Sequence, residues 1–169
     1  MKNEQNTLGK TANPFLVSSR QENYDVLLDM IKQSHHDVII FSHSLDGQLY
    51  DTSEFAENLR QLSLDNKHSK IRVLIQELDF IIKNGHRLVE LARRLPTSIE
   101  IRKANSRFEN VNSNFAIIDH QGVILRNDAY RYDAKVDYHD PRLAKELTKQ
   151  FNEMWDHSEP SMEMQRLHI

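Results

Sequence analysis

The chain has 169 residues, of which 38% are hydrophobic and 28% charged, and its net charge is −3. This length suffices for one globular domain with its own core. The absence of an apolar run of about 18 residues excludes a membrane-spanning helix, and the absence of Cys excludes a disulfide scaffold and a Cys-based nucleophile. Residues 1–13 are polar and carry neither a secretory signal nor an Arg-rich transit peptide. We therefore expect residues 1–14 to be a flexible arm, and the protein to be cytoplasmic without membrane insertion.

The first predicted elements alternate helix and strand. A capping box at Ser19 and Glu22 precedes apolar residues at helical spacing, which predicts a helix over 20–33. The β-branched, apolar run over 37–41 predicts a strand buried on both faces. A helix over 52–65 and a strand over 71–75 follow.

Five further elements complete the predicted order. A helix is predicted over 85–94, ended by Pro96, and the alternating residues 98–102 predict a strand. Residues 114–119 and 123–126 flank the turn His120-Gln121-Gly122, which predicts an antiparallel hairpin. The last helix begins at Asp140-Pro141, with Asp as the N-cap and Pro at the first helical position.

This order of elements predicts the fold class. Helices between consecutive strands imply right-handed crossovers, and the hairpin adds antiparallel strands. We therefore predict a single α/β domain over residues 15–169, with a mixed β-sheet flanked by helices on both faces.

The polar segment from Ser42 to Gly47 leaves the carboxyl end of the first strand. Ligands collect at such ends in open α/β sheets, so we expect the site here. The nine His residues show no metal-ligand spacing, and no glycine-rich phosphate loop or Gly-x-Ser-x-Gly elbow occurs. The sequence therefore predicts no metal and no cofactor.

Three further segments have open interpretations. The amides after Gly85-His86-Arg87 form either an anion site or an ordinary helix start. Tyr130, Tyr132 and Tyr138 either stack on a ligand or complete the core. The segment 82–107 has a local charge of +5 and either attracts phosphate or is a solvated mixture of faces.

The hairpin resembles part of one half of a phospholipase D-like fold. That family carries a His-x-Lys-x-x-x-x-Asp signature on this hairpin, followed by Gly-Ser-x-Asn. Aligned on Asp119, the signature's His falls on Asn112 and its Lys falls on Asn114, while Arg126-Asn127-Asp128 follows Gly122 in place of Gly-Ser-x-Asn. Only Asp119 matches.

A narrower resemblance covers residues 15–169. It rests on Ser42-His-Ser-Leu-Asp46, Leu49-Tyr-Asp51, Gly85-His-Arg-Leu88, Leu91-Ala-Arg-Arg-Leu95, Arg131-Tyr132, Phe151-x-x-x-Trp155 and Arg166-Leu-His-Ile169. These motifs are similar to an uncharacterised bacterial domain of the phospholipase D-like type, which is sometimes found after a GNAT-type acetyltransferase domain. No acetyltransferase domain is visible here, so no acetyl-CoA activity is inferred.

The resemblance implies a module that has lost its catalytic groups. The active family uses a His nucleophile and Lys side chains that neutralise phosphate, and Asn supplies neither. We predict a catalytically degenerate pseudoenzyme that binds an anionic, phosphate-containing ligand or a protein partner, with a homodimer as a further candidate. The predicted ligand-binding residues are His43, Asp46, Gln76, His86, Arg87, Asn112, Asn114, Asp119 and Arg126.

Two other functions stay open. One is a hydrolase or transferase in which His43 or His86 acts as base and Asp46 or Asp119 orients it. The other is a nucleic-acid-binding module that uses the basic segment and the tyrosines, which the negative net charge does not favour.

Overall fold

The computed structural model describes residues 5–160, which build on one seven-stranded sheet with the order β1-β7-β6-β5-β2-β3-β4. Three strands run parallel to one another: β2 (Asp37–Ser42), β3 (Lys70–Ile75) and β4 (Ile99–Lys103). Four strands extend the sheet through antiparallel pairs: β5 (Asn114–Ile118), β6 (Gly122–Arg126), β7 (Ala134–Asp137) and β1 (Phe15–Val17). The predicted α/β fold with a mixed sheet is confirmed.

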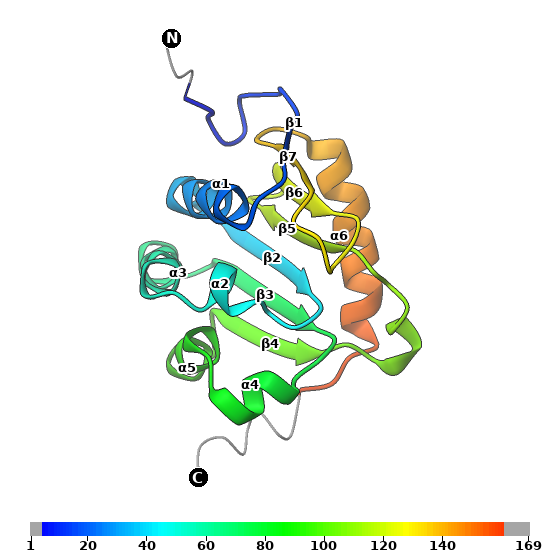
Figure 1. Cartoon of the computed structure of the whole chain (residues 1–169). Coiled ribbons are helices and arrows are strands. Elements are labelled where there is room, and N and C mark those ends of the chain that lie inside the picture. The colour runs from blue at the N-terminus through cyan, green and yellow to red at the C-terminus, as the bar shows by residue number, and fades with distance from the viewer. Residues whose placement is uncertain (1–4, 161–169) are drawn as a thin grey trace.

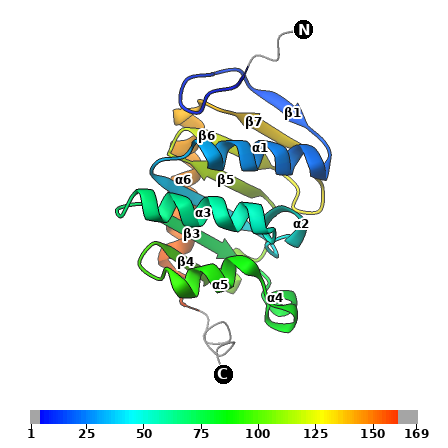
Figure 2. The ribbon, with the colours of Figure 1, turned by 90° about the vertical axis from the view of Figure 1, so that its left-hand side faces the viewer.

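Helices cover both faces of the sheet (Figure 1). One face carries α1 (Arg20–Gln33), α3 (Ser53–Asp65) and α5 (Arg87–Arg94), with the short α2 (Gly47–Tyr50) and α4 (Asp79–Asn84) beside them, as Figure 2 shows. The other face carries α6 (Pro141–Asp156), and a 3-10 turn, η1 (Ser106–Phe108), follows β4.

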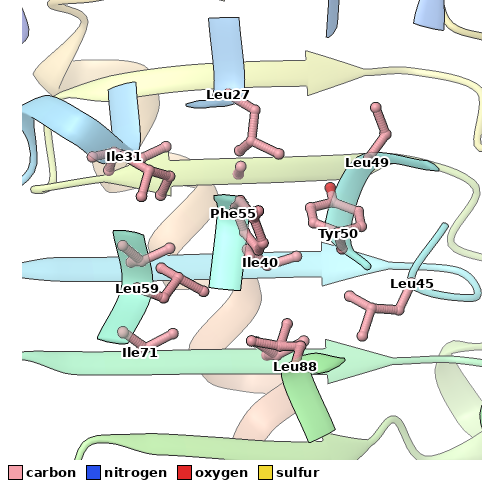
Figure 3. Packing of buried hydrophobic residues seen from close by; sticks show 14 of the residues in the cluster. Leu27, Ile31, Ile40, Leu45, Leu49, Tyr50, Phe55, Leu59, Ile71 and Leu88 are labelled. Atoms are coloured by element: carbon pink, nitrogen blue, oxygen red, sulfur yellow. The ribbon is translucent and has the colours of Figure 1, made fainter. Parts of the chain in front are cut away.

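The core forms two layers because the central strands are buried on both faces. On the α1, α3 and α5 side, apolar residues of the helices interlock with those of β2 and β3, and the short α2 adds Leu49 and Tyr50 (Figure 3). On the α6 side, Phe41 and Phe115 pack 5.4 Å apart, and Phe151 stacks on Trp155.

Five elements were not expected from the sequence: the strands β1 and β7, the short helices α2 and α4, and the 3-10 turn η1. The strands β1 and β7 are only three and four residues long and lie at one side of the sheet. Their alternation of apolar and polar residues is weak, and Leu16 of the edge strand β1 is 82% exposed. The α4 helix has no side-chain cap, and Gly85, with φ of 76°, separates it from α5.

Part of the segment before β1 contacts the rest of the domain, and the flexibility that we expect for residues 1–14 stays a prediction. The amide of Gly9 donates to the carbonyl of Tyr138 (2.8 Å), and the amide of Leu8 donates to Gln33 Oε1 (2.8 Å). Residues 1–4 and 161–169, including the motif Arg166-Leu-His-Ile169, lie outside the described residues. Within residues 5–160, no helix has the length and apolar composition needed to cross a membrane.

Candidate functional site

Eight of the nine predicted site residues lie at one edge of the sheet, which we name the carboxyl edge because β2, β3 and β4 end there. Antiparallel pairing brings the start of β5 and the end of β6 to the same edge. The eight residues are His43, Asp46, Gln76, His86, Arg87, Asn112, Asn114 and Arg126.

The two Asn residues in the signature positions hold the backbone together. Asn114 is only 5% exposed, and its Oδ1 accepts a hydrogen bond from the backbone N–H of His43 (3.0 Å). Asn112 donates from Nδ2 to Asp128 (3.3 Å), and its carbonyl accepts from the amide of Ala129 (2.7 Å). These side chains join β5 to the end of β2 and to the β6–β7 loop, and they provide neither a nucleophile nor a cation.

Gln76 connects three segments of the carboxyl edge. Its Nε2 donates to the carbonyls of Phe108 (3.1 Å) and Val111 (2.9 Å), and its Oε1 lies 3.3 Å from His43 Nδ1. The ring of His43 also lies 5.5 Å from the ring of Tyr130, whose side chain is 77% exposed. The imidazole of His43 is therefore held from two sides while it stays partly exposed to solvent.

A pocket of about 140 Å³ opens beside His43, and we name it the carboxyl-edge pocket. Its lining residues are His43, Gln76, Glu77, Lys103, Ala104, Asn105, Ser106 and Glu109. Lys103, at the end of β4, is the cationic residue of this lining. Glu77 and Glu109 are its acidic residues, so the lining combines residue types that donate and accept hydrogen bonds.

Arg126 lies under the same edge and is 6% exposed. It donates from Nε to the carbonyl of Arg131 and from Nη2 to that of Ala129, each at 2.8 Å. Its guanidinium lies 4.9 Å from the centre of the Tyr132 ring. No carboxylate of the described residues forms an ion pair with it. A buried charge without such a partner is costly and leaves positive potential at this edge.

Polar groups surround Arg126. A cavity of about 10 Å³ beside it is lined by Asn23, Tyr50 and Asn114 together with apolar side chains. Burial raises the pKa of Tyr50 to about 12, so this phenol is neutral at physiological pH. Asp46 approaches from the outside and accepts a hydrogen bond from the hydroxyl of Tyr132 (2.6 Å).

The start of α5 is closed by protein groups. His86 is 5% exposed, its Nδ1 accepts from the amide of Leu88 (3.0 Å), and its Nε2 lies 3.2 Å from the carbonyl of Leu45. The amide of Arg87 donates to Asp51 (2.9 Å), and the Arg87 guanidinium pairs with the same carboxylate (3.3 Å). Because these amides already have partners, the anion site considered after Gly85 does not form here.

Asp119 is the predicted site residue that the structure places elsewhere. It lies at the opposite end of β5, at the edge where β2 begins, which we name the amino edge. Its carboxylate accepts from the backbone amides of His35 (2.8 Å), His36 (2.9 Å) and Asp37 (3.1 Å). Its φ of 54° suits the tight turn into β6. Asp119 therefore ties the hairpin to β2 and lies at the opposite edge from the other eight predicted residues.

The predicted pairing of a His with an Asp does not occur at the carboxyl edge. Within residues 5–160, neither His43 nor His86 forms a hydrogen bond with Asp46, and Asp119 lies at the amino edge. The His–carboxylate contact that the structure does contain joins His120 to Asp37 (2.8 Å) at the amino edge.

The basic segment 82–107 does not form one surface. Arg93 pairs with Glu90 on α5, and Arg102 pairs with Glu100 on β4. Arg102 also lies 4.4 Å from the Trp155 ring, on the opposite face of the sheet from α5. These charges are distributed over both faces, and Arg87, Arg93 and Arg102 pair with carboxylates.

The tyrosines of the β6–β7 region have separate roles. Tyr138 is buried in the core, Tyr132 joins Arg126 to Asp46, and Tyr130 is exposed beside His43. Sequence reasoning missed Lys103, Asn105 and Ser106 as pocket residues. The rule that ligands collect at carboxyl ends would have found them if it had been applied to the third parallel strand as well as to the first.

Comparison with solved structures supports the fold. Nuc from Salmonella typhimurium, a phospholipase D family member, has a TM-score of 0.63 and 12% identity, and the match covers 88% of this chain and 99% of Nuc. NucT from Helicobacter pylori has a TM-score of 0.65 and 11% identity, with coverages of 88% and 99%. At these identities the likeness shows a phospholipase D-like fold and nothing about activity.

A third similar structure is TrmBL2, an archaeal chromatin protein that binds DNA, with a TM-score of 0.64 and 15% identity. The match covers 88% of this chain but 54% of TrmBL2, so the chain corresponds to about half of that protein. The family model for a domain of unknown function, DUF7931, matches residues 19–167. The chain therefore belongs to the DUF7931 family and has a phospholipase D-like fold.

Proposed function

We propose that the protein is a catalytically degenerate phospholipase D-like module that binds an anionic, phosphate-containing ligand at the carboxyl-edge pocket. The observation that carries the proposal is the state of the signature positions. Asn112 and Asn114 replace the nucleophile and the cation, and their side chains bond to the protein. Cationic groups nevertheless remain at this edge.

Two cationic side chains of the edge support an anion, against the two acidic residues Glu77 and Glu109 in the pocket lining. Lys103 lines the pocket, and Arg126 adds a buried positive charge that no carboxylate pairs with. The partly exposed imidazole of His43 lies between these elements, at the end of β2. Charge-assisted hydrogen bonds from such groups are the usual means of holding a phosphate.

Hydrolysis by the mechanism of the active family needs groups that this edge does not hold in the usual places. A phosphoryl group must be attacked by a nucleophile while cations stabilise the developing charge. An amide performs neither task, and a second copy of the chain would bring the same two Asn residues. Binding without turnover is therefore the function that we propose.

A small ligand suits the site better than a nucleic acid. TrmBL2 binds DNA, but the basic residues of segment 82–107 lie on both faces of the sheet, and Arg93 and Arg102 among them pair with carboxylates. A protein partner, a homodimer, a bacterial cytoplasmic setting and an association with an acetyltransferase domain remain predictions from the sequence.

The experiment is isothermal titration calorimetry of the purified protein with inorganic phosphate and, separately, with adenosine monophosphate. We expect saturable binding that weakens about tenfold in Lys103→Ala, since one charge-assisted hydrogen bond is lost. The matched control is Lys67→Ala, which removes an exposed Lys at the amino edge and should change nothing.

A parallel assay measures hydrolysis of bis(4-nitrophenyl) phosphate. We expect no turnover above that of the buffer. Absent binding, or equal affinities in the wild type and Lys103→Ala, would reject the site. Hydrolysis by purified Lys103→Ala protein that is lost in purified His43→Ala protein would favour the enzymatic alternative.

A further inference from the structure

We infer that the carboxyl-edge pocket selects a protonated phosphate group over sulfate, because Gln76 fixes His43 as a hydrogen-bond acceptor. This inference rests on the proposed function and names the ligand class of that same pocket. It follows from the orientation of one amide and from the balance of donors and acceptors around it.

The orientation of the Gln76 amide is determined by its neighbours. Its NH₂ group donates to two carbonyl oxygens, those of Phe108 and Val111. A carbonyl oxygen accepts only, so the amide cannot be turned without losing both bonds and placing oxygen against oxygen. The Oε1 of Gln76 therefore faces His43.

The tautomer of His43 follows from that orientation. Gln76 Oε1 is an acceptor, so Nδ1 of His43, 3.3 Å away, carries the proton. The neutral ring then has its lone pair on Nε2. No group of residues 5–160 donates a hydrogen bond to that nitrogen, and His43 lines the pocket, so Nε2 is left for a ligand.

The rest of the pocket adds acceptors as well as donors. Glu77 and Glu109 are acidic residues of the lining, while the side chains of Lys103, Asn105 and Ser106 can donate. A ligand that fills this pocket and pairs with both kinds of group must accept from the donors and donate to the acceptors, His43 Nε2 among them. The aromatic neighbour of His43 is Tyr130.

Phosphate and sulfate differ in this respect. Both are tetrahedral oxyanions of similar size, but inorganic phosphate and its monoesters keep a P–OH group over part of the neutral and acidic pH range, while sulfate has none. Only phosphate can donate to Nε2 and to the carboxylates. Sulfate would leave those acceptors unpaired and would face the carboxylates with its own negative charge.

The test measures the affinities of inorganic phosphate and sulfate at about pH 7.5 and equal ionic strength, with the full chain, because an imidazole of ordinary pKa is mostly neutral there while inorganic phosphate still carries a P–OH group. We expect phosphate to bind at least about tenfold more tightly, since unpaired buried or partly buried acceptors are costly. In His43→Leu the ratio should fall to about threefold or less. The control His68→Leu removes an exposed imidazole at the amino edge and should keep the wild-type ratio.

Nitrogen NMR of the ligand-free protein tests the tautomer without any ligand. We expect the neutral ring of His43 to show a protonated, pyrrole-type Nδ1 and an unprotonated, pyridine-type Nε2. The opposite assignment overturns the inference. Equal affinities for phosphate and sulfate overturn it while leaving the proposed function standing, and the absence of saturable binding for either anion overturns both.

Discussion

The two edges of one sheet use the same residue types for different purposes. At the amino edge, the Asp119 carboxylate accepts from three backbone amides, and Asp37 contacts both His120 and the amide of Lys70. At the carboxyl edge, Arg126 is buried without an ion pair, and His43 lines an open pocket. The carboxylates of Asp119 and Asp37 are hydrogen-bonded to protein groups, beside an open pocket of about 470 Å³ that Asp119 also lines, whereas the carboxyl edge has the smaller pocket of about 140 Å³.

The two edges separate the positions that align with the phospholipase D signature. Asp119, the residue that matches the signature, holds the β5–β6 turn against the start of β2. Asn112 and Asn114, which do not match, lie at the other end of β5. The position that matches the signature thus holds the sheet at the amino edge, and the two positions that differ lie at the carboxyl edge.

The largest expected effect comes from putting the signature's Lys back. Asn114→Lys places a second cation beside Arg126, its partner across β5 and β6. It also removes the acceptor for His43. We expect a loss of about 3 kcal/mol in the free energy of unfolding, as for an uncompensated buried charge. Urea denaturation followed by circular dichroism measures it.

The matched control for that substitution is Asn114→Asp. It keeps the Oδ1 acceptor for the His43 amide and places a negative charge across from Arg126. It should therefore be clearly more stable than Asn114→Lys. Equal stabilities would mean that the Arg126 charge does not dominate the carboxyl edge.

The second effect tests the amino edge. Asp119→Ala removes three hydrogen bonds to backbone amides and places Ala at φ of 54°, so we expect about 2 kcal/mol of destabilisation. Asp119→Asn should lose less, because Asn tolerates this backbone conformation and keeps one acceptor. Phosphate affinity should be unchanged in both variants. A loss of affinity in the folded variants would mean that Asp119 takes part in ligand binding.

A smaller effect concerns the link between Arg126 and Asp46. Burial, together with the hydrogen bond to Asp46, raises the pKa of Tyr132. Tyr132→Phe removes that bond but keeps the ring beside Arg126, so we expect about 1 kcal/mol of destabilisation. Tyr130→Phe, at an exposed position, is the control and should have no effect. Equal losses in the free energy of unfolding of the two variants would mean that the Tyr132 hydroxyl does not stabilise the edge.

The smallest effect is pH dependent. Burial lowers the pKa of His86 from its ordinary value of 6.5, so the unfolded chain takes up this proton before the folded protein does. The stabilisation is complete above that ordinary value and is lost as the pH falls below it toward the folded-state pKa. Between about pH 7.5 and about pH 5, the wild type should lose more free energy of unfolding than His86→Asn, which retains an N-cap side chain. Denaturation at the two pH values measures this loss. An identical loss in the two proteins would contradict this.

Strong local patterns made the central fold predictable. The capping box of α1, the buried runs of β2 and β3, and the Asp140-Pro141 start of α6 each specify an element from neighbouring residues alone. The strands β1 and β7 were missed because their pairing, Phe15 with Val136 for instance, joins residues far apart in sequence. Their few residues carry little periodicity of their own.

The site was only partly predictable for a related reason. The rule about carboxyl ends located His43, but it took the antiparallel pairing of β5 to show that Asn114 shares that edge and Asp119 does not. The orientation of Gln76 depends on carbonyl groups more than 30 residues away, which no sequence pattern reveals.

The most direct measurement is a two-dimensional amide NMR titration of the wild-type protein with inorganic phosphate at constant ionic strength. The account expects saturable shifts at His43, Lys103, Asn105 and Ser106, with the resonances of Asp119 and His120 unmoved. Shifts centred on the amino edge, or none that saturate, would contradict the claim that the two edges divide ligand binding from architecture.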